Sequence, residues 1–181
     1  QLLGRALDMA GHPAAAVETW AEVQAEAVPQ RLPLPPTSTR TGDWPAPAPK
    51  PEGVSSLLLL WGLPGSLVER VAHTFDLAGM PLRADRFGPK PPNDLFQRYD
   101  TITSLDSGSA DAQALVAQWR ELLPTRGISN GVIFDWLLFW DNAMLRALRP
   151  HLPEAVLMAV IRDPRDMLLD WLAFGSPAPF A

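Results

Sequence analysis

Two short segments of this chain combine residue types that suit the binding of an oxyanion. The first is GLPGS at residues 62–66, directly after an apolar run at 57–61. Backbone N–H groups at the start of a helix bind an anion when the loop before the helix curls around it. The second is RDPRD at residues 162–166, after an apolar run at 155–161. The guanidinium group of Arg162 can hold a phosphate through two parallel hydrogen bonds.

The first segment also has a purely structural interpretation. Ser66 and Glu69 have the spacing of a capping box, in which the two side chains satisfy N–H groups in the first turn of a helix. A loop as short as 62–66 also curls less around an anion than a longer one does. Both interpretations of this segment, an anion site and a capped helix start, therefore stay open.

The second segment has two interpretations as well. The guanidinium group of Arg162 can pair with the carboxylates of Asp163, Asp166 or Asp170, and such a cluster would do no more than hold the turn. Asp163 is suited to cap the helix that follows, and Pro164 suits the first position of that helix. A phosphate site and a local ion-pair cluster are the alternatives.

Alternating strand and helix patterns predict that both segments lie at the same edge of a sheet. Strands that alternate with helices require crossover connections, and so they predict a mostly parallel sheet, in which ligands bind at the carboxyl ends of strands. The predicted fold class is α/β, with a P-loop-type doubly wound parallel sheet preceded by an α-helical hairpin. We expect strands at 57–61, 131–135 and 155–161, and helices at 67–78, 110–123, 141–148 and 164–174.

The chain before this region has two different compositions. Residues 1–29 carry apolar residues at helical spacing on both sides of a turn at 11–13, which predicts a helical hairpin. Their pattern resembles a tetratricopeptide repeat, of which about three are needed for a stable array, so a preceding array is expected; a simple amphipathic helix pair is the alternative. Residues 30–53 are rich in proline and predict an extended linker, with a proline-rich ligand as the second interpretation.

Composition argues against several classes of function. A net charge of -5 disfavours non-specific binding to nucleic acid or to anionic membranes. The chain has no cysteine, and its three histidines lie far apart in the sequence, so no metal site is expected. The apolar runs are much shorter than the ~20 residues that span a bilayer, and no signal-peptide pattern is present. We therefore expect a cytoplasmic protein.

Taken together, the two segments resemble sulfotransferases that use 3′-phosphoadenosine 5′-phosphosulfate (PAPS), in particular the bacterial type with tetratricopeptide repeats before the transferase domain. LLLLWGLPGSLVERV at 57–71 is similar to the family's 5′-phosphosulfate loop and helix, and VIRDPRDMLLDW at 160–171 is similar to its 3′-phosphate segment. The resemblance implies that 54–181 is the N-terminal part of such a domain. It also implies transfer of a sulfuryl group from PAPS to a hydroxyl acceptor by in-line displacement. The residues implied to bind the cosubstrate are Gly62, Pro64, Gly65, Ser66 and Arg162, and no catalytic residue is assigned.

The chain departs from the family pattern in both segments. After Pro64 the family has a basic residue and several hydroxyl groups, whereas this chain has only Gly65 and Ser66 before an apolar residue. Asp170 stands where the family has a serine, and a carboxylate there would repel a phosphate or neutralise Arg162. These departures favour a second hypothesis, in which a non-catalytic sulfotransferase-like module binds a protein or peptide partner alongside helical repeats.

Other residues have a structural interpretation beside a functional one. Asp135 matches the family's Asp-Lys-x-Pro pattern, although the lysine and the proline are missing here. His73 could act as a general base, but a lone histidine on an amphipathic helix is more often a packed or surface residue. Aromatic residues at 136, 139 and 140 could stack on an adenine, but such a stretch is more often core. The cations that could replace the missing basic side chain are Arg70, Arg83, Arg86 and Arg126.

Overall fold

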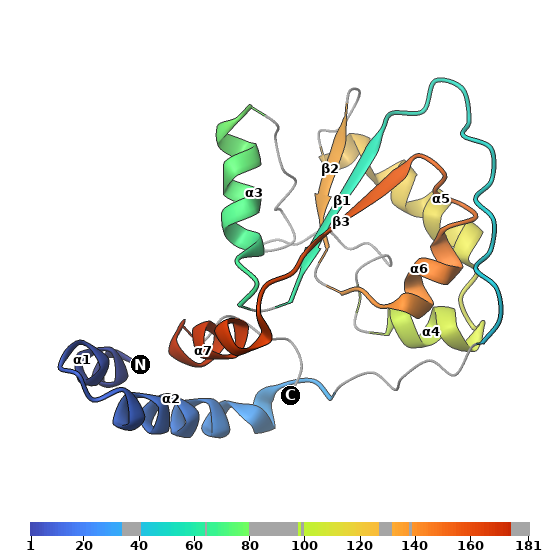
Figure 1. Ribbon diagram of the computed structural model, residues 1–181. Helices are drawn as coiled ribbons and strands as arrows, with labels where there is room; N and C mark the ends of the chain where they lie inside the picture. The colour runs from blue at the N-terminus through green and yellow to red at the C-terminus, as the bar shows by residue number, and fades with distance from the viewer. Residues whose placement is uncertain are drawn as a thin grey trace. The chain divides into compact units, whose positions relative to one another are not determined.

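Three parallel strands form the sheet of this α/β protein, in the order β2-β1-β3 (Figure 1). They are β1 (Leu57–Gly62), β2 (Ile133–Trp136) and β3 (Ala155–Val160). Leu57 pairs with Ile133 at the start of the β1–β2 ladder. The α/β class predicted from the sequence is confirmed, with a parallel sheet as expected. The finer assignment to a P-loop-type doubly wound fold stays a prediction.

This computed structural model describes residues 1–33, 41–63, 65–79, 98, 100–126, 132–137 and 139–174. The described residues form two compact units. One unit contains residues up to 33, residues 62–71 and residues from 160 onward, and the other unit contains the remaining described residues. Both predicted oxyanion segments belong to the first unit. This division cuts across the segments 1–29, 30–53 and 54–181 expected from the sequence.

The second unit is built around the central strand β1. The side chains of Leu57, Leu59 and Leu60 are at most 2% exposed, as expected for a strand with neighbours on both sides. The helix α3 (Val68–Leu77) packs on β2 through a contact between Phe75 and Phe134, whose ring centroids lie 4.8 Å apart. Burial of these apolar side chains is the main source of stability for this unit.

Three further helices gather on one side of the strands (Figure 1). They are α4 (Thr101–Ser107), α5 (Ala112–Leu122) and α6 (Asn142–Leu148). The carboxylate of Asp111 accepts a hydrogen bond from the N–H of Gln113, which caps α5. Asp141 caps α6 in the same way. The capping residues explain why α5 and α6 begin one or two residues later than predicted, whereas α4 was not predicted at all.

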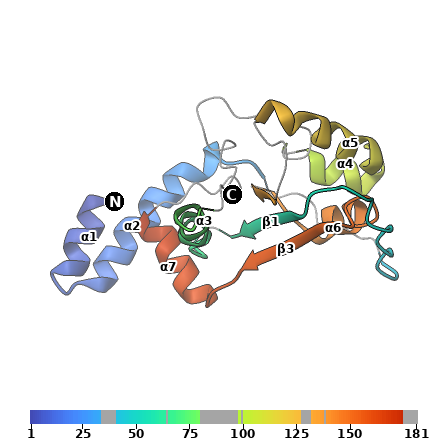
Figure 2. The same cartoon turned by 90° about the horizontal axis from the view of Figure 1, so that it is seen from above.

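The first unit contains a helical hairpin that packs on the last helix. The hairpin consists of α1 (Leu2–Met9) and α2 (Pro13–Ala27), and α2 lies beside α7 (Pro164–Phe174) (Figure 2). Gly4 allows the close approach of the two hairpin helices, because a Cβ atom there would lie 2.7 Å from Cε2 of Trp20. Trp20 is 4% exposed and forms a small core with residues of α2 and α7. Whether the hairpin is a tetratricopeptide repeat stays a prediction.

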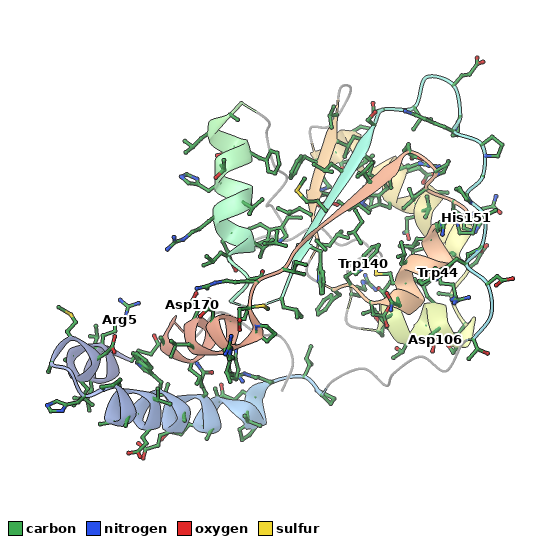
Figure 3. The ribbon with its side chains drawn as sticks, viewed as in Figure 1. Arg5, Trp44, Asp106, Trp140, His151 and Asp170 are labelled. Atoms are coloured by element: carbon green, nitrogen blue, oxygen red, sulfur yellow. The ribbon has the colours of Figure 1, made fainter. Side chains whose placement is uncertain are left out.

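Part of the proline-rich stretch is held against α6 by a single arginine. The guanidinium group of Arg146 donates hydrogen bonds to the carbonyl oxygens of Gly42, at 3.0 Å, and Asp43, at 2.8 Å. The same group lies 4.7 Å from the centroid of the Trp44 ring, which is a cation–π contact (Figure 3). Residues 42–44 are therefore attached to the second unit, and they do not behave as a free spacer.

Candidate functional site at the strand ends

The two predicted segments meet in the first unit. β1 and β3 are neighbours in a parallel sheet, so their carboxyl ends lie at the same edge. Nη1 of Arg162, which follows β3, donates a hydrogen bond of 3.3 Å to the carbonyl oxygen of Gly65, which follows β1. The structure thus brings Gly62, Gly65, Ser66 and Arg162 together, while Pro64 lies outside the described residues.

The turn after β1 has an unusual backbone. Gly65 has a φ of 81° and Leu67 a φ of 66°, and Leu67 is the only residue other than glycine with a positive φ among the described residues. The N–H of Ser66 donates to the carbonyl oxygen of Leu63 at 3.0 Å. That N–H group is therefore already used inside the turn. A phosphate bound here would have to compete with Leu63 for this donor.

Gly65 is needed for close packing as well as for its backbone conformation. A Cβ atom at this position would overlap the carbonyl oxygen of Met167 and lie 2.9 Å from its carbonyl carbon. Only a glycine lets the turn approach the backbone of α7 this closely. This contact accounts for Gly65 without a ligand.

The predicted capping box at Ser66 and Glu69 is wrong. The helix α3 begins at Val68, so Ser66 lies too early in the chain to cap it. The Ser66 side chain lies against Gly62. A Cβ atom at Gly62 would overlap the Ser66 hydroxyl oxygen and would lie 2.7 Å from Cβ of Val68. Ser66 is 2% exposed, and its hydroxyl group has no hydrogen-bond partner in the described part of the chain. The positive φ at Leu67 separates Ser66 from the helix, which is why the two side chains do not form the reciprocal bonds.

Two carboxylates of α7 lie close to the guanidinium group of Arg162. Nη1 of Arg162 forms a short hydrogen bond with Oδ2 of Asp170 on α7 (Figure 3), and Nε lies 3.7 Å from Oδ2 of Asp166. These three side chains carry a net charge of -1. Asp170 thus neutralises Arg162, as one of the two interpretations of the sequence expected. A phosphate would have to displace a carboxylate and then remain close to both.

Asp163 caps α7, as its position before Pro164 predicts. Oδ1 of Asp163 accepts a hydrogen bond of 2.9 Å from the N–H of Arg165, and Pro164 is the first residue of the helix. The Arg165 guanidinium also donates to Oδ1 and Oδ2 at 3.1 and 2.8 Å. Asp163 therefore pairs with Arg165, and it does not belong to the carboxylates that contact Arg162.

Hydrogen bonds from the side chain and then the N–H of Arg165 lower the pKa of Asp163, and desolvation opposes them only in part. Because the folded-state pKa lies below the unfolded one, this capping contact stabilises the fold above the ordinary carboxyl pKa. The contribution is lost as the pH falls through the folded pKa. We expect Arg165→Gln to raise the pKa of Asp163 toward its ordinary value. An NMR titration of the side-chain carboxyl carbon measures this shift, and an unchanged pKa would contradict it.

Arg126, one of the other cations suggested by the sequence, is engaged away from residues 62–66 and Arg162. The guanidinium group of Arg126 is 4% exposed and pairs with Asp135, with Nη2 at 3.1 Å from Oδ1 and Nη1 at 3.3 Å from Oδ2. It is therefore committed to a buried ion pair in the second unit. Arg70 lies on the surface of α3, and Arg83 and Arg86 lie outside the described residues.

The histidine and the aromatic residues fit their structural interpretations. His73 is exposed on α3 and Phe139 is 8% exposed in the core of the second unit. Trp136 and Trp140 are half-buried. None of these observations requires a ligand.

Sequence reasoning missed Gln24, which links the hairpin to α7. Gln24 is 5% exposed, and its Nε2 donates to the carbonyl oxygen of Trp171 at 3.2 Å. Its position could have indicated this burial, because Ala16, Trp20 and Gln24 follow one another at intervals of four residues on one face of α2. A polar residue on an otherwise apolar helix face is a signal for a buried hydrogen bond.

Known proteins provide no additional evidence for this site. Comparisons with family models, with curated proteins and with solved structures found no match. In the described part of the chain, no three acidic or histidine side chains are grouped so that they could hold a metal ion. No helix in that part has the length and apolar character needed to cross a membrane. The functional assignment therefore depends on the geometry at residues 62–71 and 160–174.

Proposed function

We propose that this chain is part of a sulfotransferase-like protein that acts as a non-catalytic binding or scaffold module. The observation that carries the proposal is the pairing of Arg162 with Asp170. The arginine that would hold the 3′-phosphate of PAPS instead joins the turn after β1 to α7, through the carbonyl oxygen of Gly65 and the carboxylate of Asp170.

The energies involved support this proposal. A hydrogen bond to a charged group contributes roughly 1.5–3 kcal/mol to stability or binding. A phosphate at Arg162 would have to replace the Asp170 contact at least, so its net gain is small. It would also face the repulsion of Asp166 and Asp170, and the family's basic residue is absent from the turn after β1.

A helical scaffold is supported by the packing of the first unit. The hairpin α1–α2 and the helix α7 share a core that contains Ala16, Trp20 and Ala173. The turn after β1 is packed on the same helix α7 through Gly65 and Met167. A unit of this kind can present helices to a protein or peptide partner, which is the partner class that we propose.

Sulfuryl transfer from PAPS to a hydroxyl acceptor is the second candidate. The observation that favours it is the meeting of Gly65 and Arg162 at the carboxyl ends of neighbouring parallel strands, where ligands of such sheets bind. The buried hydroxyl group of Ser66, which has no partner, adds a donor in the same turn. In this candidate Arg162 would contact the 3′-phosphate and residues 65–66 would lie near the 5′-phosphosulfate.

Titration calorimetry with adenosine 3′,5′-bisphosphate separates the two candidates. We expect no measurable heat from the unaltered protein, because the guanidinium group of Arg162 is already hydrogen-bonded to the carboxylate of Asp170. Asp170→Ser removes that carboxylate and is expected to create weak binding. Asp166→Ser is the matched control, since it removes the same charge from a more distant position, and it is expected to have a smaller effect.

One outcome would reverse the order of the candidates. If the unaltered protein binds the bisphosphate with micromolar affinity and Arg162→Ala abolishes that binding, the scaffold proposal fails and PAPS-dependent transfer becomes the better assignment. Circular dichroism of each variant shows whether the loss reflects unfolding. Binding by the unaltered protein that is insensitive to Arg162→Ala would place the nucleotide elsewhere and contradict both candidates.

A further inference from the structure

The C-terminal turn of α7 contacts a second polar cluster, formed by Gln24, Arg31 and Trp171. Nε2 of Gln24 donates to the carbonyl oxygens of Trp171 and Leu172, at 3.2 and 3.4 Å. These carbonyls belong to the last described turn of α7. Oε1 of Gln24 accepts a short hydrogen bond from Nη2 of Arg31. Gln24 is therefore fully engaged, and it fixes the orientation of the Arg31 guanidinium.

Two donors of this cluster have no acceptor. The Arg31 guanidinium lies over the Trp171 ring, with Cζ 4.7 Å from the ring centroid. Nη1 of Arg31 and Nε1 of Trp171 are both shielded from solvent, and neither has a hydrogen-bond partner among the described residues. A shielded donor without an acceptor costs about 1–3 kcal/mol, and more when the group is charged.

The charge of Arg31 is also uncompensated. The partners of Arg31 are the neutral side chain of Gln24 and the ring of Trp171, and no carboxylate of the described residues pairs with it. In the same unit, Arg162 and Arg165 both pair with aspartates. Cations that are partly removed from water are normally paired with an anion. Arg31 has no such pair among the described residues, so a bound anion would compensate its charge.

We propose that Arg31 and Trp171 bind the carboxylate group of a small organic acid. A carboxylate is planar, has two acceptor oxygens and carries a single negative charge, so it matches one cationic and one neutral donor. A phosphate dianion would need more donors than the two that this cluster offers. Arg31 as a whole residue is half-buried, although its Nη1 atom is shielded.

This inference goes beyond the proposed function, and it does not depend on it. Arg31 follows the hairpin in sequence and Trp171 belongs to α7, so a carboxylate that contacts both would join the hairpin to this helix within the first unit. Such a ligand would stabilise the folded protein in proportion to its occupancy. The strand-end residues at 62–66 take no part in this site.

An NMR titration of the intact protein with sodium acetate tests the site. The chain has seven tryptophans, and Trp171→Phe identifies the indole N–H signal of Trp171 as the one that disappears. We expect acetate to shift this signal in a saturable way. Arg31→Gln is expected to weaken acetate binding roughly tenfold or more, as the loss of a charged hydrogen bond implies. Arg165→Gln, which removes an exposed arginine of the same unit, is the control and is expected to leave the affinity unchanged.

Sodium chloride and sodium phosphate at matched ionic strength complete the experiment. The proposal fails if chloride shifts the Trp171 signal as strongly as acetate does, or if acetate produces no saturable shift. A saturable shift by phosphate alone would overturn the assignment to a carboxylate. The other indole signals report whether Arg31→Gln is folded. If that variant is unfolded, thermal unfolding gives the same test: acetate is expected to raise the unfolding temperature of the unaltered protein but not that of Trp171→Phe.

Discussion

Asp135→Val is expected to lower the free energy of unfolding by about 3–5 kcal/mol. The side chain of Asp135 is fully buried on β2, and it accepts hydrogen bonds from both terminal nitrogens of Arg126. Valine suits a strand and is similar in size to aspartate, so the change mainly removes the charge. The Arg126 guanidinium, which is 4% exposed, loses both of its hydrogen bonds to this carboxylate. Native stability is only about 5–15 kcal/mol, so this loss is a large fraction of the total.

Urea unfolding followed by circular dichroism measures this effect, with an unchanged slope as the sign that only stability has altered. The control is the double variant Arg126→Met with Asp135→Val. Replacing both charges by apolar groups also removes the cation that has lost this carboxylate, so most of the lost stability is expected to return. A single variant that costs less than about 1 kcal/mol would contradict the expected contribution of this pair to stability.

Apolar periodicity predicted most of the regular structure. The runs that predict strands at 57–61 and 155–161 became β1 and β3. The central strand β1 is buried, as an uninterrupted apolar run predicts, whereas β3 ends the described strand order and leaves Val156 60% exposed. The helix at 164–174 was predicted with its bounds, since Asp163 and Pro164 determine its start through local chemistry. The helix α4 has only seven residues and was not predicted, although the equally short α6 was.

The location of the strand-end site was predictable from the sequence, but the partner of Arg162 at that site was not. Adjacent parallel strands place residues 62–66 and Arg162 at one sheet edge whatever their side chains do. The choice between phosphate and carboxylate at Arg162 depends on the position of Asp170 eight residues later, which only a formed helix determines. The capping box failed for a similar reason, because a leucine with positive φ is rare and no sequence pattern announces it.

The packing of the hairpin on α7 lies beyond local patterns altogether. Gln24 and Trp171 are 147 residues apart in the sequence, yet they form a hydrogen bond. A helical face with Ala16, Trp20 and Gln24 indicates that it is covered, but it does not name the helix that covers it. The inference of a carboxylate site therefore became possible only once Arg31 and Trp171 were seen together.

Gly65→Ala is expected to destabilise the protein by about 2–5 kcal/mol, because two costs add. The φ of 81° is strained for any residue with a Cβ atom, at about 1–2 kcal/mol. The new methyl group would also overlap the carbonyl oxygen of Met167, so the turn and α7 must separate. That separation breaks the hydrogen bond from Arg162 to Gly65. Thermal unfolding and hydrogen exchange of the first turns of α7 measure the loss.

Gly11→Ala is the matched control, because Gly11 has nearly the same φ, at 82°, but nothing within 4 Å of the added methyl group. Its cost is expected to be the backbone term alone, about 1–2 kcal/mol. The difference between the two variants therefore measures how tightly the turn after β1 packs on α7. If the two variants lose equal stability, Gly65 serves only the backbone conformation. The turn could then move away from α7 at little cost, as a bound phosphate would require, and the scaffold proposal would lose its structural basis.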